Sequence, residues 1–215
     1  MSHAVIEKPQ SPPGKAEKRT ELHCYRIVGL ENPEQLIRVK EFIRSVFVAG
    51  GYTKSAYTAV DLDPWSTWFY VKNSADEILS AMRVVEKKPN NFLPLEMAVI
   101  EGSYPPKRYA LIEENVADWN NVAFLNTRSG WRAAVINFCS VAKHCLEKNY
   151  TTTYGFYDPK MKSIVRIYSS AGAKLSEKYN QLVFFPGSSL NGEPVFLNII
   201  EIPKASLQII ASKIP

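Results

Sequence analysis

The chain has 215 residues, of which 46% are hydrophobic and 12% aromatic, enough to bury one sizeable core. Its three cysteines are an odd number without a Cys-x-x-Cys spacing, and its three histidines are scattered, so neither a disulfide framework nor a metal site is indicated. The net charge of +5 favours an acidic partner. The scattered basic residues carry no helix-turn-helix, zinc-finger or aromatic RNA-binding signature, which disfavours nucleic acid as that partner.

The first 20 residues are rich in proline, lysine, glutamate and serine. They hold no apolar run long enough for a signal peptide or a membrane span. We expect a disordered tail over residues 1–20, followed by a single domain over residues 21–215. Because the cysteine pattern favours a reducing compartment, the sequence predicts a cytoplasmic protein.

The first half of the domain has clear start and stop signals. Asn32, Pro33 and Gln35 form a capping signal for a helix, and two consecutive glycines after it mark its end. In chain order we expect a strand over 23–28, a helix from Pro33 to about Phe47, a long loop over 48–66, strands over 67–72 and 77–85 joined as a hairpin, and an irregular segment over 86–106.

The second half alternates strands and helices. Asp158 and Pro159 predict the start of a helix, and Gly172 predicts its end. In chain order we expect a segment over 115–126 that ends in a buried central strand, a helix from about Trp131 through Glu147, a strand over 151–157, a helix over 159–171, and strands over 173–185 and 193–201. This order predicts an α+β fold in which helices flank a mixed central β-sheet.

Four groups of residues carry a resemblance to a known family. They are Arg44-Ser-Val-Phe47-Val, then Asp61-x-Asp63-x-x-Ser66, then Ser80-Ala-Met-Arg83-Val-Val with Leu93-Pro-Leu-Glu96, and finally Val116-Ala-Asp118-Trp-Asn-Asn121-Val-Ala-Phe124. With the helix that ends in Tyr168-x-x-x-Gly172, they resemble the branch of the GNAT acyltransferase fold that contains acyl-homoserine-lactone synthases and long-chain N-acyl amino acid synthases. The family has arginine at the position of Ile43, glutamate at that of Asp118 and arginine at that of Asn121.

The resemblance implies a site for an acyl thioester. The donor would lie between two central strands, 122–126 and 151–157, that splay apart, and backbone N–H groups beside the splay would stabilise the oxyanion. The residues that would hold the donor are Phe124, Leu125, Asn126, Arg128, Gly130 and Arg132, where the family carries its pyrophosphate loop. Alternatively, this turn is only a capped helix start with exposed arginines and binds no phosphate.

The resemblance also implies catalytic and acceptor residues. Asp118 would activate or orient the attacking amine, with Glu96 or Glu114 in reserve. Tyr168 would protonate the departing thiolate, although a core tyrosine on an apolar helix stripe explains it equally simply. The acceptor side would comprise Phe47, Asp61, Asp63, Arg83 and Asn121. An Asp–Arg pair among them could equally be a structural clamp.

These features imply an N-acyltransferase that moves a fatty acyl group from an acyl carrier protein or coenzyme A thioester to a small amine such as an amino acid. One alternative is a short-chain, coenzyme A-dependent acetyltransferase. The other is a non-catalytic GNAT-fold protein that binds an acyl ligand or a partner, which the departures at Ile43, Asp118 and Asn121 favour. Six basic residues could form a face that binds the carrier protein or the coenzyme A phosphate: Lys143, His144, Lys148, Lys160, Lys162 and Arg166. Alternatively, they are simply solvated surface residues.

Overall fold

The first helix begins and ends where its caps predict. The computed structural model describes residues 21–53, 60–160 and 169–213. Within them, helix α1 spans Pro33–Ala49. Asn32 Oδ1 accepts the backbone N–H of Gln35 at 3.1 Å, which satisfies one of the donors left over at a helix start. Gly50 follows the last helical residue, so the predicted helix is confirmed.

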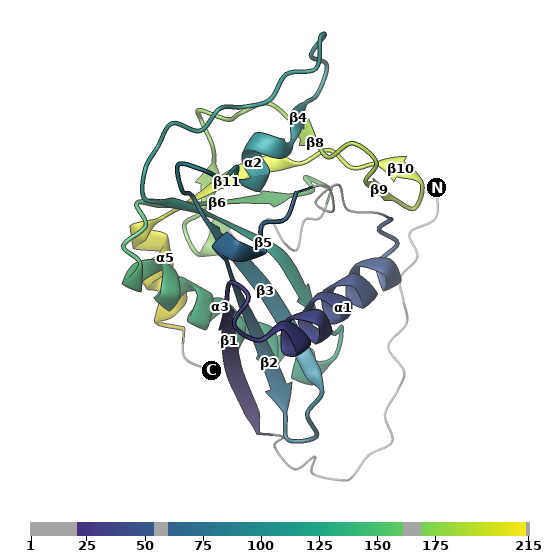
Figure 1. Cartoon of the computed structure of the whole chain (residues 1–215), viewed down its shortest axis with the longest axis vertical. Helices are drawn as coiled ribbons and strands as arrows, with labels where there is room; N and C mark the ends of the chain where they lie inside the picture. Colours follow the sequence, from purple (N-terminus) through teal and green to yellow (C-terminus); the bar gives the residue numbers. More distant parts are fainter. Residues whose placement is uncertain (1–20, 54–59, 161–168, 214–215) are drawn as a thin grey trace.

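A seven-stranded mixed sheet lies at the centre, with the strand order β1-β2-β3-β5-β6-β11-β7 (Figure 1). Its strands are β1 (Leu22–Val28), β2 (Ser66–Asn73), β3 (Ile78–Glu86), β5 (Val116–Phe124), β6 (Thr152–Tyr157), β7 (Lys174–Leu175) and β11 (Asn198–Pro203). Neighbouring strands are antiparallel, except that β5 and β6 are parallel. The predicted α+β class with a mixed central sheet is confirmed.

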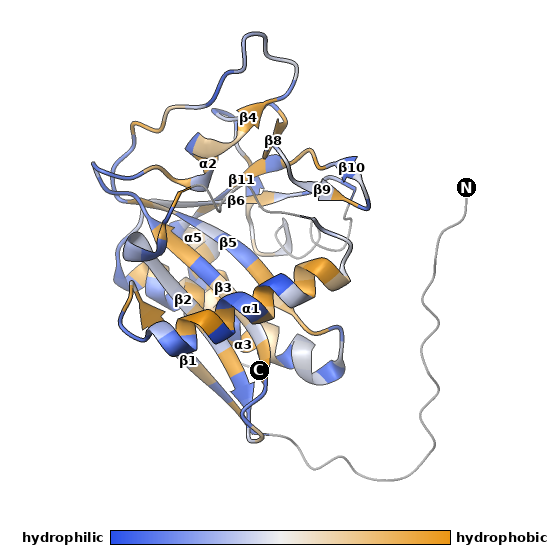
Figure 2. Ribbon diagram, turned by 45° about the vertical axis from the view of Figure 1, so that its right-hand side comes forward, coloured by the Kyte–Doolittle hydropathy of each residue, from blue (hydrophilic) through white to orange (hydrophobic). Residues whose placement is uncertain are grey.

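Different helices cover the two faces of the sheet. Helices α3 (Arg128–Glu147) and α5 (Lys204–Ala211) pack on one face, over a core that contains Trp119. Helix α1 crosses the other face, over a core that contains Trp68 (Figure 1). Figure 2 shows the apolar residues of α1 recurring along the helix, as expected when one stripe faces the sheet.

Beyond α1, short elements cover the rest of that face. They are the 3₁₀ turn η2 (Asp63–Trp65), helix α2 (Pro94–Met97), and strands β4 (Val99–Ile100), β8 (Val183–Phe184), β9 (Ser189–Leu190) and β10 (Glu193–Pro194). β4 pairs with β8, so the segment between β3 and β5 is tied to the segment before β11 (Figure 1). Leu93 and Leu95 are fully buried beneath this layer. The layer therefore covers the sheet over β5 and β6, and we call it the roofing layer.

The C-terminal third differs from its prediction. The expected strand 173–185 is wrong in extent, because Ser176 Oγ accepts the N–H of Tyr179 at 3.0 Å and turns the chain away between β7 and β8. The expected strand 193–201 is replaced by β10 and β11. Helices α2 and α5 were not expected. Most of the helix expected over 159–171 lies outside the described residues.

The cysteines pack in the structure without pairing. Cys139 and Cys145 are buried and Cys24 is half-buried. Burial raises the pKa of the Cys145 thiol to about 12, so this thiol stays protonated and inert. Over the ranges that the structure describes, no helix is both long and apolar enough to cross a membrane, and no group of His, Cys, Asp and Glu residues could hold a metal ion.

Candidate functional site

The two central strands separate partway along their length. The parallel pairs that join β5 to β6 are Val116 with Thr152, Ala117 with Thr153, and Asp118 with Tyr154. Beyond them, β5 runs on to Phe124 and β6 to Tyr157 without further pairing between the two strands. Gly155 lies just past the last pair, where a Cβ would come within 3.2 Å of the Trp119 carbonyl oxygen. The strands therefore part directly after a close contact, as the resemblance predicts.

A β-bulge lies in β5 beside this opening. Ala81 of β3 pairs with Ala123 and Arg83 pairs with Asn120, so β5 has one residue more than β3 over this interval. Asn121 has a φ of +52°, in the left-handed region that asparagine enters more readily than most residues. A bulge leaves its extra residue out of the ladder. Asn121, expected on the acceptor side, therefore also has a backbone role at the opening.

The turn into α3 follows the bulged strand directly. Thr127 Oγ1 accepts the N–H of Gly130 at 3.0 Å and caps the helix. Gly130 must be glycine, because a Cβ there would overlap the carbonyl oxygen of Leu125. Arg128 is exposed and Arg132 is half-buried. A helix N-terminus with two nearby guanidinium groups is a favourable place for an anion.

The other residues expected to hold the donor lie at the same junction. Phe124 and Leu125 are half-buried and Asn126 is exposed. The ring of Phe124 lies 4.7 Å from that of Trp131, measured between centroids, which joins the end of β5 to the first turn of α3. The strand opening, the bulge and the helix start therefore follow one another along β5 and the turn into α3.

A buried polar row crosses β3 and β5 under the roofing layer. Arg83 Nε donates to Asn120 Oδ1 at 2.8 Å, and Asn120 Nδ2 donates to Asp118 Oδ1 at 2.6 Å. All three side chains are buried, and Asp118 has no exposed surface. The two expected residues, Arg83 and Asp118, thus meet through an amide that the sequence analysis did not single out.

The environment of Asp118 changes its acidity. Burial raises the pKa of its carboxyl group to about 7, although the Asn120 amide, the Arg83 cation and the Leu95 backbone N–H oppose the rise. Oδ1 is held by Asn120, whereas Oδ2 is buried without a hydrogen bond of normal geometry in the described structure. Asp118 therefore has one oxygen anchored by a side chain and one buried oxygen that no side chain holds in the described structure.

The acidic pair before β2 lies at the other end of this row. Asp61 Oδ1 accepts the N–H of Asp63, and Asp63 Oδ2 pairs with Lys40. Lys40 Nζ and the Arg83 guanidinium lie 5.6 and 5.1 Å from the centre of the Trp68 ring. The Trp68 ring therefore contacts both Lys40, the partner of Asp63, and Arg83, which belongs to the polar row with Asp118.

No family model and no curated protein match the sequence. Solved structures do match it in fold. The N-acyl amino acid synthase FeeM from uncultured soil microbes is 15% identical, with a TM-score of 0.60 over 91% of this chain and 99% of that one. The AHL synthase LasI is 12% identical, with a TM-score of 0.57 over 90% and 95%. The chain has the GNAT acyltransferase fold. A GNAT-family acetyltransferase from Staphylococcus aureus Mu50 is 12% identical, with a TM-score of 0.50 over 85% and 99%.

Within this GNAT fold, the carboxylate of Glu96 makes several contacts that hold the roofing layer in place. Its Oε2 accepts the Leu93 N–H at 2.9 Å and pairs with Lys87 at 2.6 Å, and its Oε1 accepts the Leu111 N–H at 3.3 Å. The contact with the Leu93 N–H is the Glu96 half of a capping box at the start of α2; the leucine has no side-chain oxygen to supply the other half. Glu96 thus has a structural explanation, and its catalytic role stays a prediction. Glu114, the other expected alternative to Asp118 as the catalytic carboxylate, is exposed.

The remaining expected residues lie at the far end of α1 or outside the described ranges. Phe47 is half-buried and its ring lies edge-on to that of Tyr52, 5.4 Å away between centroids. The loop after α1 is tied to β9, since the Thr53 N–H donates to the Ser189 carbonyl at 2.9 Å. Tyr168 lies outside the described residues, so its role also stays a prediction.

Asn120 and Lys40 were not predicted from the sequence as site residues. Asn120 follows Asp118 by two positions, which places both on the same face of a strand, and this spacing was the available signal. Its partner Arg83 is set by the register between β3 and β5, which no local pattern reveals. Lys40 lies on the helix α1, and its pairing with Asp63 likewise depends on tertiary structure.

Proposed function

We propose that this chain is an N-acyltransferase that moves an acyl group of long chain from an acyl carrier protein or coenzyme A thioester to a small amine such as an amino acid. One observation carries the proposal: the opening between β5 and β6, the bulge at Asn121 and the N-terminus of α3 follow one another along β5 and the turn after it, in a GNAT fold. The similarity to an N-acyl amino acid synthase and an AHL synthase favours a long acyl chain and an amine acceptor.

The reaction requires a stabilised oxyanion. The amine nitrogen attacks the thioester carbonyl carbon, and the carbonyl electron pair moves to oxygen. When the tetrahedral intermediate collapses, the C–S bond breaks and the thiolate leaves, taking up a proton to become a thiol. Backbone N–H groups at the bulge around Asn121 are suited to donate to the oxyanion, and losing one such donor typically slows a reaction about a hundred- to a thousand-fold.

Asp118 is the proposed general base. With a pKa of about 7, its carboxyl group can accept a proton from the acceptor ammonium near neutral pH. Because Asn120 anchors Oδ1, Oδ2 is the oxygen that would receive the proton. Since Asp118 is buried, it would act on an amine seated in the opening, directly or through one water molecule.

The donor's phosphate groups are proposed to lie at the start of α3. The first-turn N–H groups of α3, with Arg128 and Arg132, offer donors and positive charge to a pyrophosphate or phosphopantetheine group. Tyr168 is retained as the proposed acid for the departing thiolate. The unpaired cysteines favour a reducing compartment, and we propose the cytoplasm.

A donor screen tests the proposed reaction. The full-length protein is incubated with carrier-protein and coenzyme A thioesters of short and long acyl chains, with and without a pool of amino acids, and thiol release is followed. We expect amine-dependent release that is fastest with long-chain donors. If acetyl-coenzyme A were the only donor turned over rapidly, the short-chain alternative would be established. If no donor released thiol, the proposal that the protein is an acyltransferase would be refuted.

The variant Asp118→Asn tests the general base. Because the base must be deprotonated, the wild-type rate should rise with pH through about 7 and then level off. In the variant we expect a rate about a hundred- to ten-thousand-fold lower, without this rise. The exposed Glu177, changed to glutamine, is the matched control and should keep the wild-type profile. An unchanged profile in Asp118→Asn would reject the assignment.

A further inference from the structure

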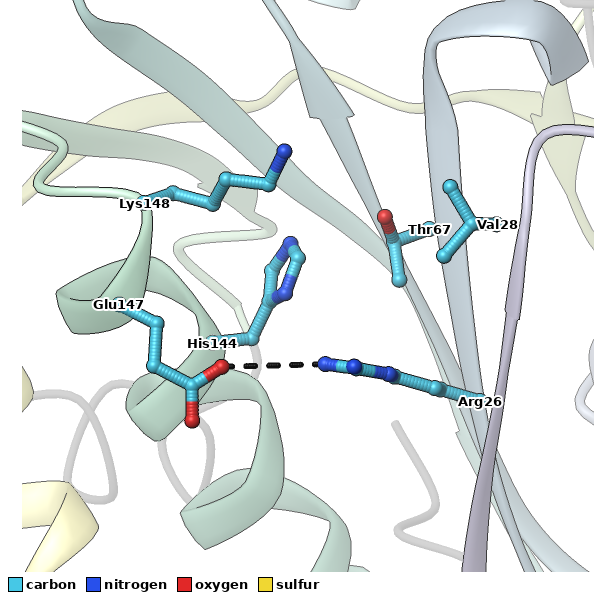
Figure 3. Close-up of a pocket in the computed structure, with 6 residues that line it drawn as sticks. All are labelled: Arg26, Val28, Thr67, His144, Glu147 and Lys148. Carbon is cyan, nitrogen blue, oxygen red and sulfur yellow. Dashed lines mark ion pairs between the residues drawn. The ribbon is translucent and has the colours of Figure 1, made fainter.

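A separate cavity of about 350 Å³ lies between β1, β2 and the end of α3 (Figure 3). It is lined by Arg26, Val28, Thr67, His144, Glu147 and Lys148. Thr67 and His144 are buried and form its floor, whereas the other four side chains are exposed at its rim. The cavity contains no residue of the proposed acyl-transfer site.

His144 is the unusual residue of this cavity. Only 4% of it is exposed, which corrects its expected place on a basic surface. Its neighbours include the rings of Phe69 and Tyr150, at 5.2 and 6.4 Å between centroids. Its Nε2 atom is buried without a hydrogen-bond partner in the described structure. Figure 3 shows the imidazole facing the space between Lys148 and Arg26. A buried polar atom left unpaired in this way calls for a partner.

The cations at the rim retain capacity for a ligand. Arg26 lies 3.7 Å from Glu147 and Lys148 lies 3.6 Å from Glu86, distances too long for hydrogen bonds. The other oxygen of Glu86 is held by Lys88 at 2.8 Å. Of the charged residues that line the cavity, two are cationic and one is anionic. A single negative charge would therefore balance the site.

We propose that this pocket binds a small carboxylate, seated between Lys148 and Arg26 and accepting the Nε2–H of His144. The two oxygens of a carboxylate can accept from the cations and from His144 together. Val28 offers an apolar wall to a short aliphatic chain. Glu147 and the negative end of α3 disfavour more highly charged anions and weaken the binding.

Binding should be linked to the protonation of His144. Burial, together with the cations Lys148 and Arg26 and against the opposing effect of Glu147 and Glu86, lowers the pKa of His144 to about 4. His144 is thus neutral near pH 7. A carboxylate against Nε2 stabilises the imidazolium and should raise the pKa by about one unit. The affinity for the ionised form of the carboxylate should therefore increase as the pH falls toward this raised value.

Nuclear magnetic resonance of the full-length, histidine-labelled protein tests the site. Acetate and butyrate are titrated at constant ionic strength, with sodium chloride as the balancing salt, and the variant His144→Gln assigns the ring signals. We expect a saturable shift of the His144 signals, a higher titration midpoint in the presence of acetate, and tighter binding of butyrate.

Two variants of α3 separate the pocket from general charge effects. Lys148→Gln should weaken acetate binding about five-fold, as expected for losing one exposed charge. Lys143→Gln removes an exposed charge from the same helix outside the cavity and should leave binding unchanged. A shift that never saturates, an equal response to chloride, or tighter binding of inorganic phosphate would each overturn the proposal. None of these readouts depends on acyl transfer.

Discussion

Asp118 holds its carboxyl group inside the core with only one oxygen hydrogen-bonded by a side chain. A buried carboxylate without full pairing is costly, and the group avoids part of that cost by keeping a proton. A protein that needed only stability at this place would gain from an apolar side chain. The catalytic use proposed for Asp118 would account for a carboxyl group at this place.

This cost can be measured as a pH dependence of stability. The pKa of Asp118 is raised from 3.8 to about 7 on folding, so the folded state retains a proton that the unfolded state releases. The free energy of unfolding should therefore fall as the pH rises from about 4 to about 7, by an amount on the order of 4 kcal/mol. Asp118→Asn should remove this fall.

Urea unfolding at about pH 5 and about pH 8 tests this expectation. Relative to the wild type, Asp118→Asn should be more stable at the higher pH than at the lower one. Glu177→Gln controls for the loss of an ordinary exposed carboxylate. An equal stability difference at both values would show that Asp118 titrates normally.

Of the individual residues, the sequence predicted most of those in and beside the polar row, but not the residues that link them. Asp63, Arg83 and Asp118 stood out because their local motifs resemble a family. Asn120 and Lys40 have no such motif, and their roles arise from strand register and helix packing. His144 was placed on the surface by its polarity, although its neighbour Cys145 belongs to the buried stripe of the same helix.

Among the elements, β5 concentrates the backbone irregularities of the site. A β-branched residue is strained at a positive φ, whereas glycine adopts it freely. We expect Asn121→Val to destabilise the protein by about 1 to 2 kcal/mol and Asn121→Gly to change stability much less. Chemical denaturation of both variants gives the comparison. Equal losses would mean that the asparagine side chain, rather than its backbone conformation, matters at the bulge.

Capped elements were the most predictable ones. Helices α1 and α3 carry side-chain caps, from Asn32 and Thr127, and both lie where the sequence placed them. Helix α5 follows Pro203 without a side-chain cap, so its start left little local signal. The break after β7 depends on the hydroxyl of Ser176. The residues around this serine favour a strand, so the turn was not predicted.

For the whole molecule, Glu113 ties the segment before β5 to the C-terminal part. Its oxygens accept from Tyr179 Oη and Lys178 Nζ, both at 2.7 Å. Burial raises the pKa of Glu113, but the hydrogen bonds from Lys178 and Tyr179 outweigh burial and hold the pKa below its usual 4.5. The stabilisation is therefore present above about pH 4.5 and is lost as the pH falls through the folded value.

The variant Glu113→Gln tests this tie. We expect a loss of about 1 to 3 kcal/mol near pH 7, because hydrogen bonds to a charged acceptor become neutral ones. The difference from the wild type should shrink below about pH 4, where the wild-type carboxylate also gains a proton. Glu114→Gln, at the exposed neighbouring position, should have little effect. A loss that persists in acid would indicate a packing defect instead.

The overall fold was predictable because it depends on the order of elements and on apolar periodicity, which tolerate wide sequence change. FeeM has the same fold at 15% identity. The site was less predictable, since its details depend on single contacts across strands. Of the expected site residues, those in the polar row and at the α3 turn come together, and their chemical roles stay predictions.

The parallel pairing of β5 and β6 has a mechanical consequence. Three residue pairs form the whole seam between an antiparallel half, β1-β2-β3-β5, and a second antiparallel half, β6-β11-β7. Each half keeps its own ladders whatever the width of the gap beyond Asp118 and Tyr154. A thioester bound between the two strands, as proposed, would therefore displace no backbone hydrogen bond of either half.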